Sequence, residues 1–264
     1  MRLRAAIAIL SFVPGTAAAQ TDLLSNRLVD LTHALNAETI YWPTSPSTFK
    51  LDRLTYGKTD GGWFYSANTF SAPEHGGTHL DAPIHFAEGQ QTSDKIPLDH
   101  LMGPAVVIDV SKPSADNADY MLTRDDVLAF ERRHGRIKPG TIVLLRTGWS
   151  KRWPNKKQYL GDDTPGEVSG LHFPSFSEQS ARLLIEQRNA KAIGVDVASI
   201  DYGQSKDFMV HRIAAGHNVP GLENLTNLDQ LPPTGAQIIA LPIKIEGGSG
   251  GPVRVIALIP RNAR

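Results

Sequence analysis

The 264-residue sequence contains no cysteine. Disulfide cross-links, thiolate metal sites and a cysteine nucleophile are therefore excluded. Neither sign of charge dominates, because 27 basic residues balance 27 acidic ones, and this balance argues against a protein that works mainly by binding nucleic acid. A transition metal would have to be held by imidazole and carboxylate groups, which directs attention to the nine histidines.

The sequence also lacks long apolar runs, but a short apolar run lies near the N-terminus. A basic start, MRLR, is followed by the apolar residues 5–13, a Pro-Gly break and the small residues Ala17 and Ala19. This order is typical of a secretory signal peptide, and the run is less than half of the roughly 20 apolar residues that a membrane span needs. We predict cleavage before Gln20, which makes residues 1–19 the signal peptide and residues 20–264 the mature domain. Loss of Arg2 and Arg4 leaves 25 basic residues against 27 acidic ones, and the exported protein is expected in a bacterial periplasm.

The hydrophobic pattern of the mature chain predicts one mixed α/β domain that is rich in strands. Two helices are expected, one capped by Thr123 and reaching residue 133, the other capped by Ser177 and reaching residue 187. No internal repeat or linker divides the chain. Alternating or continuous apolar runs predict strands at residues 27–35, 49–56, 63–70, 103–111, 141–147, 192–200, 238–245 and 253–259.

Four metal-binding side chains lie within eleven positions of the segment HGGTHLDAPIHF: His75, His79, Asp81 and His85. The glycines between the first two histidines disfavour a helix, so a turn that enters a strand is expected. His79 and Asp81, two residues apart, would then point to one side of the strand. Pro83 lacks an N–H donor and should end the strand, which allows the chain to bring His85 back toward the same place. Two imidazoles and a carboxylate suit Zn or Mn and leave positions open for water and substrate.

The segment resembles the hallmark H-x-G-T-H-x-D-x-P-x-H of the bacterial cyclase-family metal-dependent hydrolases, which include kynurenine formamidases and isatin hydrolases. The resemblance extends over most of the mature chain. Its further matches are Trp42-Pro43, the strand end Gly194-Val-Asp196, and His211 followed twelve residues later by Glu223 in an L-E-N-L stretch.

The resemblance implies a site and a fold. By the formamidase pattern, His75, His79 and Asp81 hold one ion, Asp81, His211 and Glu223 hold a second, and His85 is the proton donor and acceptor. The isatin hydrolases use a set similar to the first one, with a single Mn. The resemblance therefore implies either one or two metal ions, and either Zn or Mn. The implied fold is a swivelling β/β/α domain, usually a homodimer.

The predicted function is hydrolysis of a C–N amide bond in an aryl formamide or a cyclic amide by metal-activated water. Trp42 resembles the family's aromatic substrate contact, while Trp63, Phe64 and His172 are further candidates to line a pocket for an aromatic amide. An isatin-type imide or lactam, hydrolysed with a single Mn, is the alternative. Thr44-Ser45 departs from the Gly-Asp pair that formamidases tend to have after Trp-Pro, and this departure bears on the substrate and not on the metal site. No nucleic-acid or membrane partner is expected.

The sequence also offers two other interpretations. Gly247-Gly-Ser249-Gly-Gly251 matches the G-x-S-x-G pattern of serine hydrolases, but Pro252 and a strand-like run follow it where a helix is required, and no histidine follows it in the chain. A loop between two strands is therefore expected there. An exported metal carrier without catalytic activity is the rival from another class. His85 separates the two, because a carrier needs no acid/base group beside an incompletely filled metal site.

Overall fold

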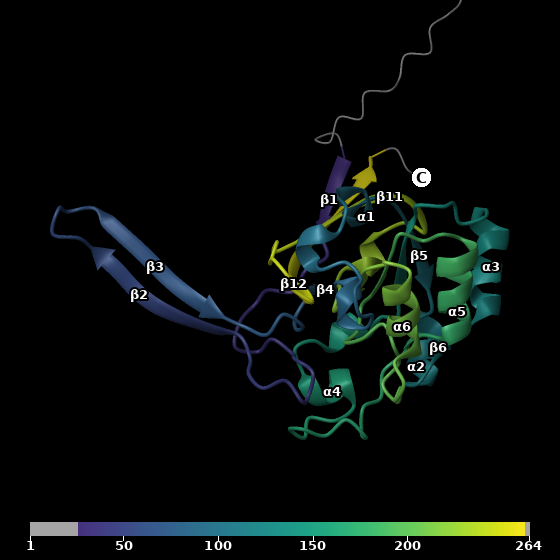
Figure 1. The fold of residues 1–264 in the computed structure, drawn as a ribbon, viewed down its shortest axis with the longest axis horizontal. Coiled ribbons are helices and arrows are strands. Elements are labelled where there is room, and N and C mark those ends of the chain that lie inside the picture. The colour runs from purple at the N-terminus through teal and green to yellow at the C-terminus, as the bar shows by residue number, and fades with distance from the viewer. Residues whose placement is uncertain (1–25, 262–264) are drawn as a thin grey trace, which may run out of the picture.

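A sheet closed on itself organises the fold. The computed structural model describes residues 26–261, and in it eight strands follow the order β1-β12-β11-β5-β7-β9-β10-β4. Strand β4 also pairs with β12, which closes a ring, and β1 adds to the outside of that ring through β12. Figure 1 shows α3 (Arg124–His134), α5 (Glu178–Arg182) and α6 (Met209–Gly216) together on one side of the body, whereas α1 (Leu98–Leu101) lies near β1 and α4 (Lys156–Leu160) lies apart from them. The sheet strands are β1 (Asn26–Asp30), β4 (His79–Asp81), β5 (Met102–Asp109), β7 (Ile142–Arg146), β9 (Ala192–Val195), β10 (Gly221–Glu223), β11 (Thr234–Pro242) and β12 (Gly250–Pro260).

Six α-helices, four 3₁₀ helices and two separate pairs of strands make up the other helices and strands of the described residues. The short strands β6 (Met121–Leu122) and β8 (Ser175–Phe176) pair in parallel. The helices are α1 (Leu98–Leu101), α2 (Ser111–Asp116), α3 (Arg124–His134), α4 (Lys156–Leu160), α5 (Glu178–Arg182), continued by a π-helical turn (Leu183–Gln187), and α6 (Met209–Gly216).

Strand β7 shows why its sequence is continuously apolar. Ile142 and Leu144 belong to the apolar cluster enclosed by the ring, whereas Val143 and Leu145 belong to the cluster shared with the helices. Because parallel strands covered on both faces need apolar side chains at every position, the expected buried strand at residues 141–147 is confirmed.

Both predicted helix starts are confirmed in atomic detail. The Thr123 side chain accepts a hydrogen bond from the backbone N–H of Asp126, and the Asp126 side chain bonds back to the cap residue. Ser177 and Ser180 make the same reciprocal arrangement at the start of α5. Each box satisfies N–H groups that have no partner within the helix.

A two-stranded hairpin, called the arm from here on, extends from the body of the domain. Strands β2 (Lys50–Lys58) and β3 (Phe64–Ser71) form an antiparallel hairpin that pairs with no other strand. Figure 1 shows it extending well away from the closed sheet. Its position was not foreseen, because the apolar pattern of residues 49–56 and 63–70 predicted strands of the domain itself.

The mixed, strand-rich α/β class is confirmed. The expected loop between β11 and β12 is present up to Ser249, but Gly250, Gly251 and Pro252 already belong to β12 and pair with β4. The predicted signal peptide, residues 1–19, lies outside the described residues. Between residues 26 and 261, none of the helices combines the length and the apolar character needed to cross a membrane.

Candidate metal centre

The turn before β4 requires both of its glycines. Gly77 has a φ of +59°, a left-handed conformation that glycine adopts at little cost. A Cβ atom on Gly76 would lie 2.0 Å from the ring of Tyr41, so any side chain there would overlap the ring. This tight turn delivers His75 beside the first residues of β4.

Strand β4 separates the metal-binding side chains from the core, as predicted. His79 and Asp81 point to the same side, while Leu80 faces the apolar interior of the ring and is 1% exposed. The neighbouring strand β10 runs antiparallel to β4 with Glu223 opposite His79. Glu223, which is remote in sequence, is thereby carried to the site by strand pairing.

Helix α6 supplies His211, and Asp201 fixes its orientation. The Asp201 carboxylate accepts hydrogen bonds from the backbone N–H groups of Val210 and His211, and it lies 2.6 Å from Nδ1 of the His211 ring. Because Nδ1 is held by this carboxylate, Nε2 is left to face the site. Nε2 lies 3.2 Å from both Asp81 Oδ2 and Glu223 Oε1.

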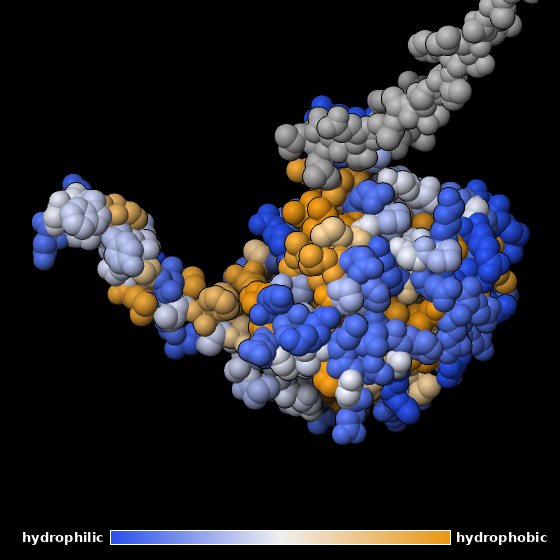
Figure 2. Space-filling view, turned by 45° about the horizontal axis from the view of Figure 1, so that its top comes forward, coloured by the Kyte–Doolittle hydropathy of each residue, from blue (hydrophilic) through white to orange (hydrophobic). Residues whose placement is uncertain are grey.

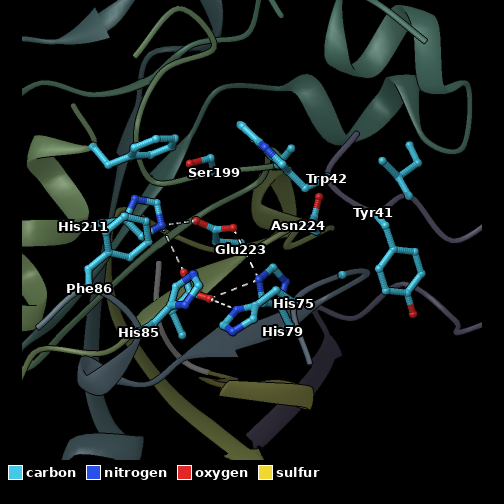
Figure 3. A pocket seen from close by; sticks show the side chains of 15 residues that line it. Tyr41, Trp42, His75, His79, His85, Phe86, Ser199, His211, Glu223 and Asn224 are labelled. Atoms are coloured by element: carbon cyan, nitrogen blue, oxygen red, sulfur yellow. Dashed lines mark hydrogen bonds and ion pairs between the residues drawn. The ribbon is translucent and has the colours of Figure 1, made fainter. Parts of the chain in front are cut away.

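Figure 3 shows His75, His79, His211 and Glu223 gathered at one end of the pocket, and Asp81 lies within 3.2 Å of all three of these histidines. Asp81 Oδ1 lies 2.6 Å from His75 Nδ1 and 3.2 Å from His79 Nε2, and Oδ2 faces His211. His79 Nε2 is also 3.4 Å from Glu223 Oε2. One carboxylate therefore joins the two groups that the resemblance implied.

The geometry fits a divalent cation. His75, His79 and Asp81 present ligand atoms within 4.8 Å of one another, and so do Asp81, His211 and Glu223. Four of these five residues are buried, and His75 is half-buried. Three imidazoles and two carboxylates packed away from solvent are the donors that Zn and Mn accept.

The charges of the cluster show what competes with the cation. Burial lowers the pKa of His79, but the carboxylates of Asp81 and Glu223 outweigh it and raise that pKa to about 9. His211 responds in the same way to Asp201, Asp81 and Glu223, so that its pKa lies well above the usual value. Burial opposes ionisation of Asp81, yet the surrounding imidazoles hold its pKa well below the ordinary range. Protons on two rings thus balance the carboxylates when no cation is bound.

Uptake of Mn²⁺ or Zn²⁺ is therefore expected to release about two protons at pH 7, because imidazole must lose its proton before it can bind a metal. Acid favours the protonated rings, so metal affinity should rise with pH, and the number of protons released should fall once His79 titrates near pH 9. Isothermal titration calorimetry in two buffers with different ionisation enthalpies measures this number. Binding heats that do not depend on the buffer would contradict the assignment.

His85 returns to the site as predicted. Pro83 ends β4 and opens a short 3₁₀ turn, Pro83–His85, that brings the imidazole back over the cluster. The His85 ring stacks on His75 with centroids 3.8 Å apart. Partial desolvation, together with the neighbouring imidazoles, lowers the pKa of His85 to about 4. The ring is therefore neutral near pH 7 and can accept a proton.

A cavity of about 260 Å³ opens above these residues. Trp42, Phe86 and Phe208 form much of its apolar wall, and Ser199 and Asn224 add polar groups. The Trp42 ring meets Phe208 edge to face with centroids 6.4 Å apart. Its size and aromatic lining suit a small planar molecule with one end directed at the metal ligands.

Three of the expected substrate contacts do not reach this cavity. Trp63 and Phe64 lie on the arm and are 64% and 59% exposed. The aromatic run predicts a pocket lining, but the hairpin extends away from the body and carries these side chains with it. His172 is exposed, pairs with Asp119 at 2.8 Å and lies outside the lining residues. His217 also lies outside the cavity lining, and its Nδ1 is 2.8 Å from the Ile213 carbonyl oxygen at the end of α6.

Sequence reasoning missed several residues of the site. Asp201 gave no signal because its partner His211 is ten positions away and in a helix that was not predicted. Phe86 directly follows the motif, and Phe208 lies three residues before His211. Phe208 has a φ of +51°, and such backbone geometry is not visible in a sequence.

The match to known proteins agrees with this geometry. A family model described as "Putative cyclase" matches residues 29–202. The chain belongs to this family. Isatin hydrolase of Roseibium aggregatum is 38% identical over 204 residues, which cover 76% of this chain and 77% of that protein. Kynurenine formamidase of Sphingopyxis alaskensis is 28% identical over 88% of this chain and 97% of its own length.

Solved structures extend the likeness to the whole described fold. Isatin hydrolase A from Ralstonia solanacearum has a TM-score of 0.81 at 37% identity, covering 96% of this chain and all of that one. An isatin hydrolase bound to the product analogue thioisatinate has a TM-score of 0.82 at 32% identity, covering 90% and 94% of the two chains.

Proposed function

We propose that this protein hydrolyses a cyclic amide fused to an aromatic ring, of the isatin type, with a divalent metal. One observation carries the proposal: the metal-ligand cluster forms one end of a cavity whose other walls include Trp42, Phe86 and Phe208. A flat bicyclic amide fits such a cavity with its carbonyl at the ligands. The higher identity to isatin hydrolases than to the formamidases supports the same choice.

The reaction class follows from the family and the ligand set. The protein is a metal-dependent hydrolase that acts on carbon–nitrogen bonds, and His75, His79, Asp81, His211 and Glu223 are the residues that would hold the metal. Asp81 directs Oδ1 to one ligand set and Oδ2 to the other. This division supports room for two ions, while Zn or Mn both suit the donors.

The side chains around the ligands transfer the proton and orient the substrate. A divalent cation bound there would lower the pKa of a water molecule and polarise the amide carbonyl. His85 accepts a proton from the attacking water and returns it to the departing nitrogen. The bond between that nitrogen and the carbonyl carbon breaks, and the carbon becomes a carboxylate. The aromatic wall keeps the ring oriented and excludes bulk water.

A substrate panel tests the proposal. Purified protein reconstituted with Mn²⁺ or Zn²⁺ is expected to open isatin faster than it cleaves an aryl formamide, and a chelator should abolish both activities. Metal analysis of the same sample gives the identity and number of ions. Faster cleavage of the formamide would favour the formamidase alternative, which the overall likeness to those enzymes supports. Metal binding without turnover of any panel member would favour the carrier.

We also propose that the protein is a homodimer joined through the arm. An isolated two-stranded hairpin gains little from folding alone, and this one exposes an unusual number of large apolar side chains. Figure 2 shows apolar surface along the arm and at its junction with the body. The large apolar side chains of the arm that are more than half exposed are Leu51, Leu54, Tyr56, Trp63, Phe64, Tyr65 and Phe70.

Replacing Trp63 and Phe64 together with serine is expected to convert the dimer into a monomer, because the apolar contact is lost. Light scattering coupled to size-exclusion chromatography measures the mass. Leu28→Ser, a change at an equally exposed apolar residue on β1, is the matched control and should leave the dimer intact. A dimeric double variant would contradict the role of the arm.

Export to a periplasm remains our proposal for the location, based on the N-terminal pattern. Cleavage before Gln20 requires the first residue of the exported protein to be Gln20. N-terminal sequencing of protein from the periplasmic fraction gives the answer, and an intact Met1 would contradict it.

A further inference from the structure

Ser249, the central residue of the apparent serine-hydrolase motif, contacts the potential metal ligand His75 on the side away from the cavity. It lies in the loop that joins β11 to β12, and its main-chain carbonyl accepts a hydrogen bond from Ala82 N–H at 2.8 Å. The Ser249 hydroxyl is 2.8 Å from His75 Nε2. Ser249 is not among the residues that line the cavity, so its place is behind a ligand and not facing a substrate.

The Ser249 hydroxyl donates its hydrogen to the Glu74 carboxylate. Glu74 Oε2 accepts hydrogen bonds from the backbone N–H of Ser249 at 3.0 Å and from its Oγ. A hydroxyl donates only one hydrogen but has two lone pairs. Because that hydrogen is directed to Glu74, the contact between Ser249 Oγ and His75 Nε2 requires the imidazole to donate.

Because the imidazole donates to Ser249, the Nε2 atom of His75 must carry a hydrogen. When Nε2 carries the hydrogen, Nδ1 of the neutral ring has a lone pair, and Nδ1 is the atom that faces Asp81 Oδ1. Two acceptors at such close range repel each other unless a cation or a proton lies between them. The ring is therefore oriented for a cation beside Nδ1.

The surroundings hold the ring in this position. His85 stacks on one face of His75. A Cβ atom on Gly250 would lie 2.7 Å from Cε1 of His75 and 2.5 Å from the Leu80 carbonyl oxygen, so the loop approaches this closely because glycine follows Ser249. The loop is anchored a second time by Ser93, whose backbone N–H donates to the Gly248 carbonyl.

We propose that Glu74 and Ser249 are positioning residues that hold His75 as the Nε2–H tautomer and present Nδ1 to the metal. The inference rests on the proposed metal site and adds two residues that act through a ligand. It also gives the glycine-rich loop a role other than nucleophilic catalysis.

Ser249→Ala is expected to weaken Mn²⁺ binding about 10- to 100-fold, the usual cost of losing a partner behind a ligating histidine. Isothermal titration calorimetry on the purified full chain measures the affinity. Ser93→Ala removes another hydroxyl that contacts the same loop, through the Ile243 carbonyl, without touching His75. This control should bind Mn²⁺ like the wild type.

Two further variants separate positioning from general support of the loop. Glu74→Gln keeps an acceptor oxygen for Ser249 and should retain affinity within a few-fold, whereas Glu74→Ala should weaken binding like Ser249→Ala. Because Glu74 acts through Ser249, adding Glu74→Ala to Ser249→Ala should cause little further loss. Losses that multiply in the double variant would overturn the linked roles.

The tautomer can be read directly in the wild-type protein, which avoids dependence on a variant that fails to fold. In Zn²⁺-loaded protein, long-range ¹H–¹⁵N spectra of the imidazoles, with His75 assigned by comparison with His75→Gln, should show a protonated Nε2 and a metal-bound Nδ1. The reverse pattern would overturn the inference. Wild-type protein that binds neither Mn²⁺ nor Zn²⁺ would instead refute the proposed function on which it rests.

Discussion

His85→Ala is expected to lower kcat by about 100- to 10,000-fold, the range typical of losing a positioned acid/base group, while the metal content stays unchanged. The His85 ring stacks on His75 at the cavity but belongs to neither ligand set. Its removal therefore takes away no ligand, but it removes the group that accepts the proton of the attacking water. Steady-state kinetics with isatin and elemental analysis of the same preparation measure the two quantities.

The matched control is His172→Ala. This histidine was also a candidate from the sequence, but it is exposed and pairs with Asp119 outside the cavity. It should retain wild-type kcat and KM. Full activity of His85→Ala would remove His85 from the mechanism, and loss of its metal would show that it acts as a ligand instead.

Asp81→Asn is expected to have the largest effect on metal binding, with affinity reduced by more than the roughly 100-fold upper range for a supporting residue. Asp81 is the one residue shared by both groups of potential ligands. Its carboxylate also faces His75, His79 and His211 at 2.6 to 3.2 Å. An amide removes the negative charge and offers one oxygen in place of two, so both ligand sets are damaged and turnover should fall to background.

Calorimetry with Mn²⁺ and elemental analysis check this result, and circular dichroism establishes that the variant is folded. Asp116→Asn, at the exposed C-terminal residue of α2, makes the same chemical change away from the site and should bind metal normally. Metal content near the wild-type level in Asp81→Asn would contradict a shared central ligand.

The sequence was most informative where the chemistry is local. The spacing of His79 and Asp81 placed both on one side of a strand because side chains alternate along a strand, and the structure agrees. Pro83 ended that strand and returned His85 toward His75 for the reason expected from its missing donor. Thr123 and Ser177 marked two helix starts because capping depends on residues within one turn.

The sequence pattern failed where position depends on the rest of the chain. Trp63 and Phe64 form an aromatic run that fits a pocket wall as well as an exposed arm, and only the closed sheet excludes the hairpin from the body. His172 offered the same ambiguity. A residue type states which contacts are chemically suitable, but not which of the suitable surfaces it will meet.

By itself, then, the amino-acid sequence determined the family, the imidazole and carboxylate character of the centre and, through the family resemblance, the residues of both ligand sets. Tertiary structure decided the rest. The pairing of β10 with β4 placed Glu223 beside His79, Asp201 turned the ring of His211, and the β12 loop brought Ser249 behind His75. These contacts join residues from ten to 174 positions apart. Closure of the sheet brings them together, and no local pattern of residues records such closure.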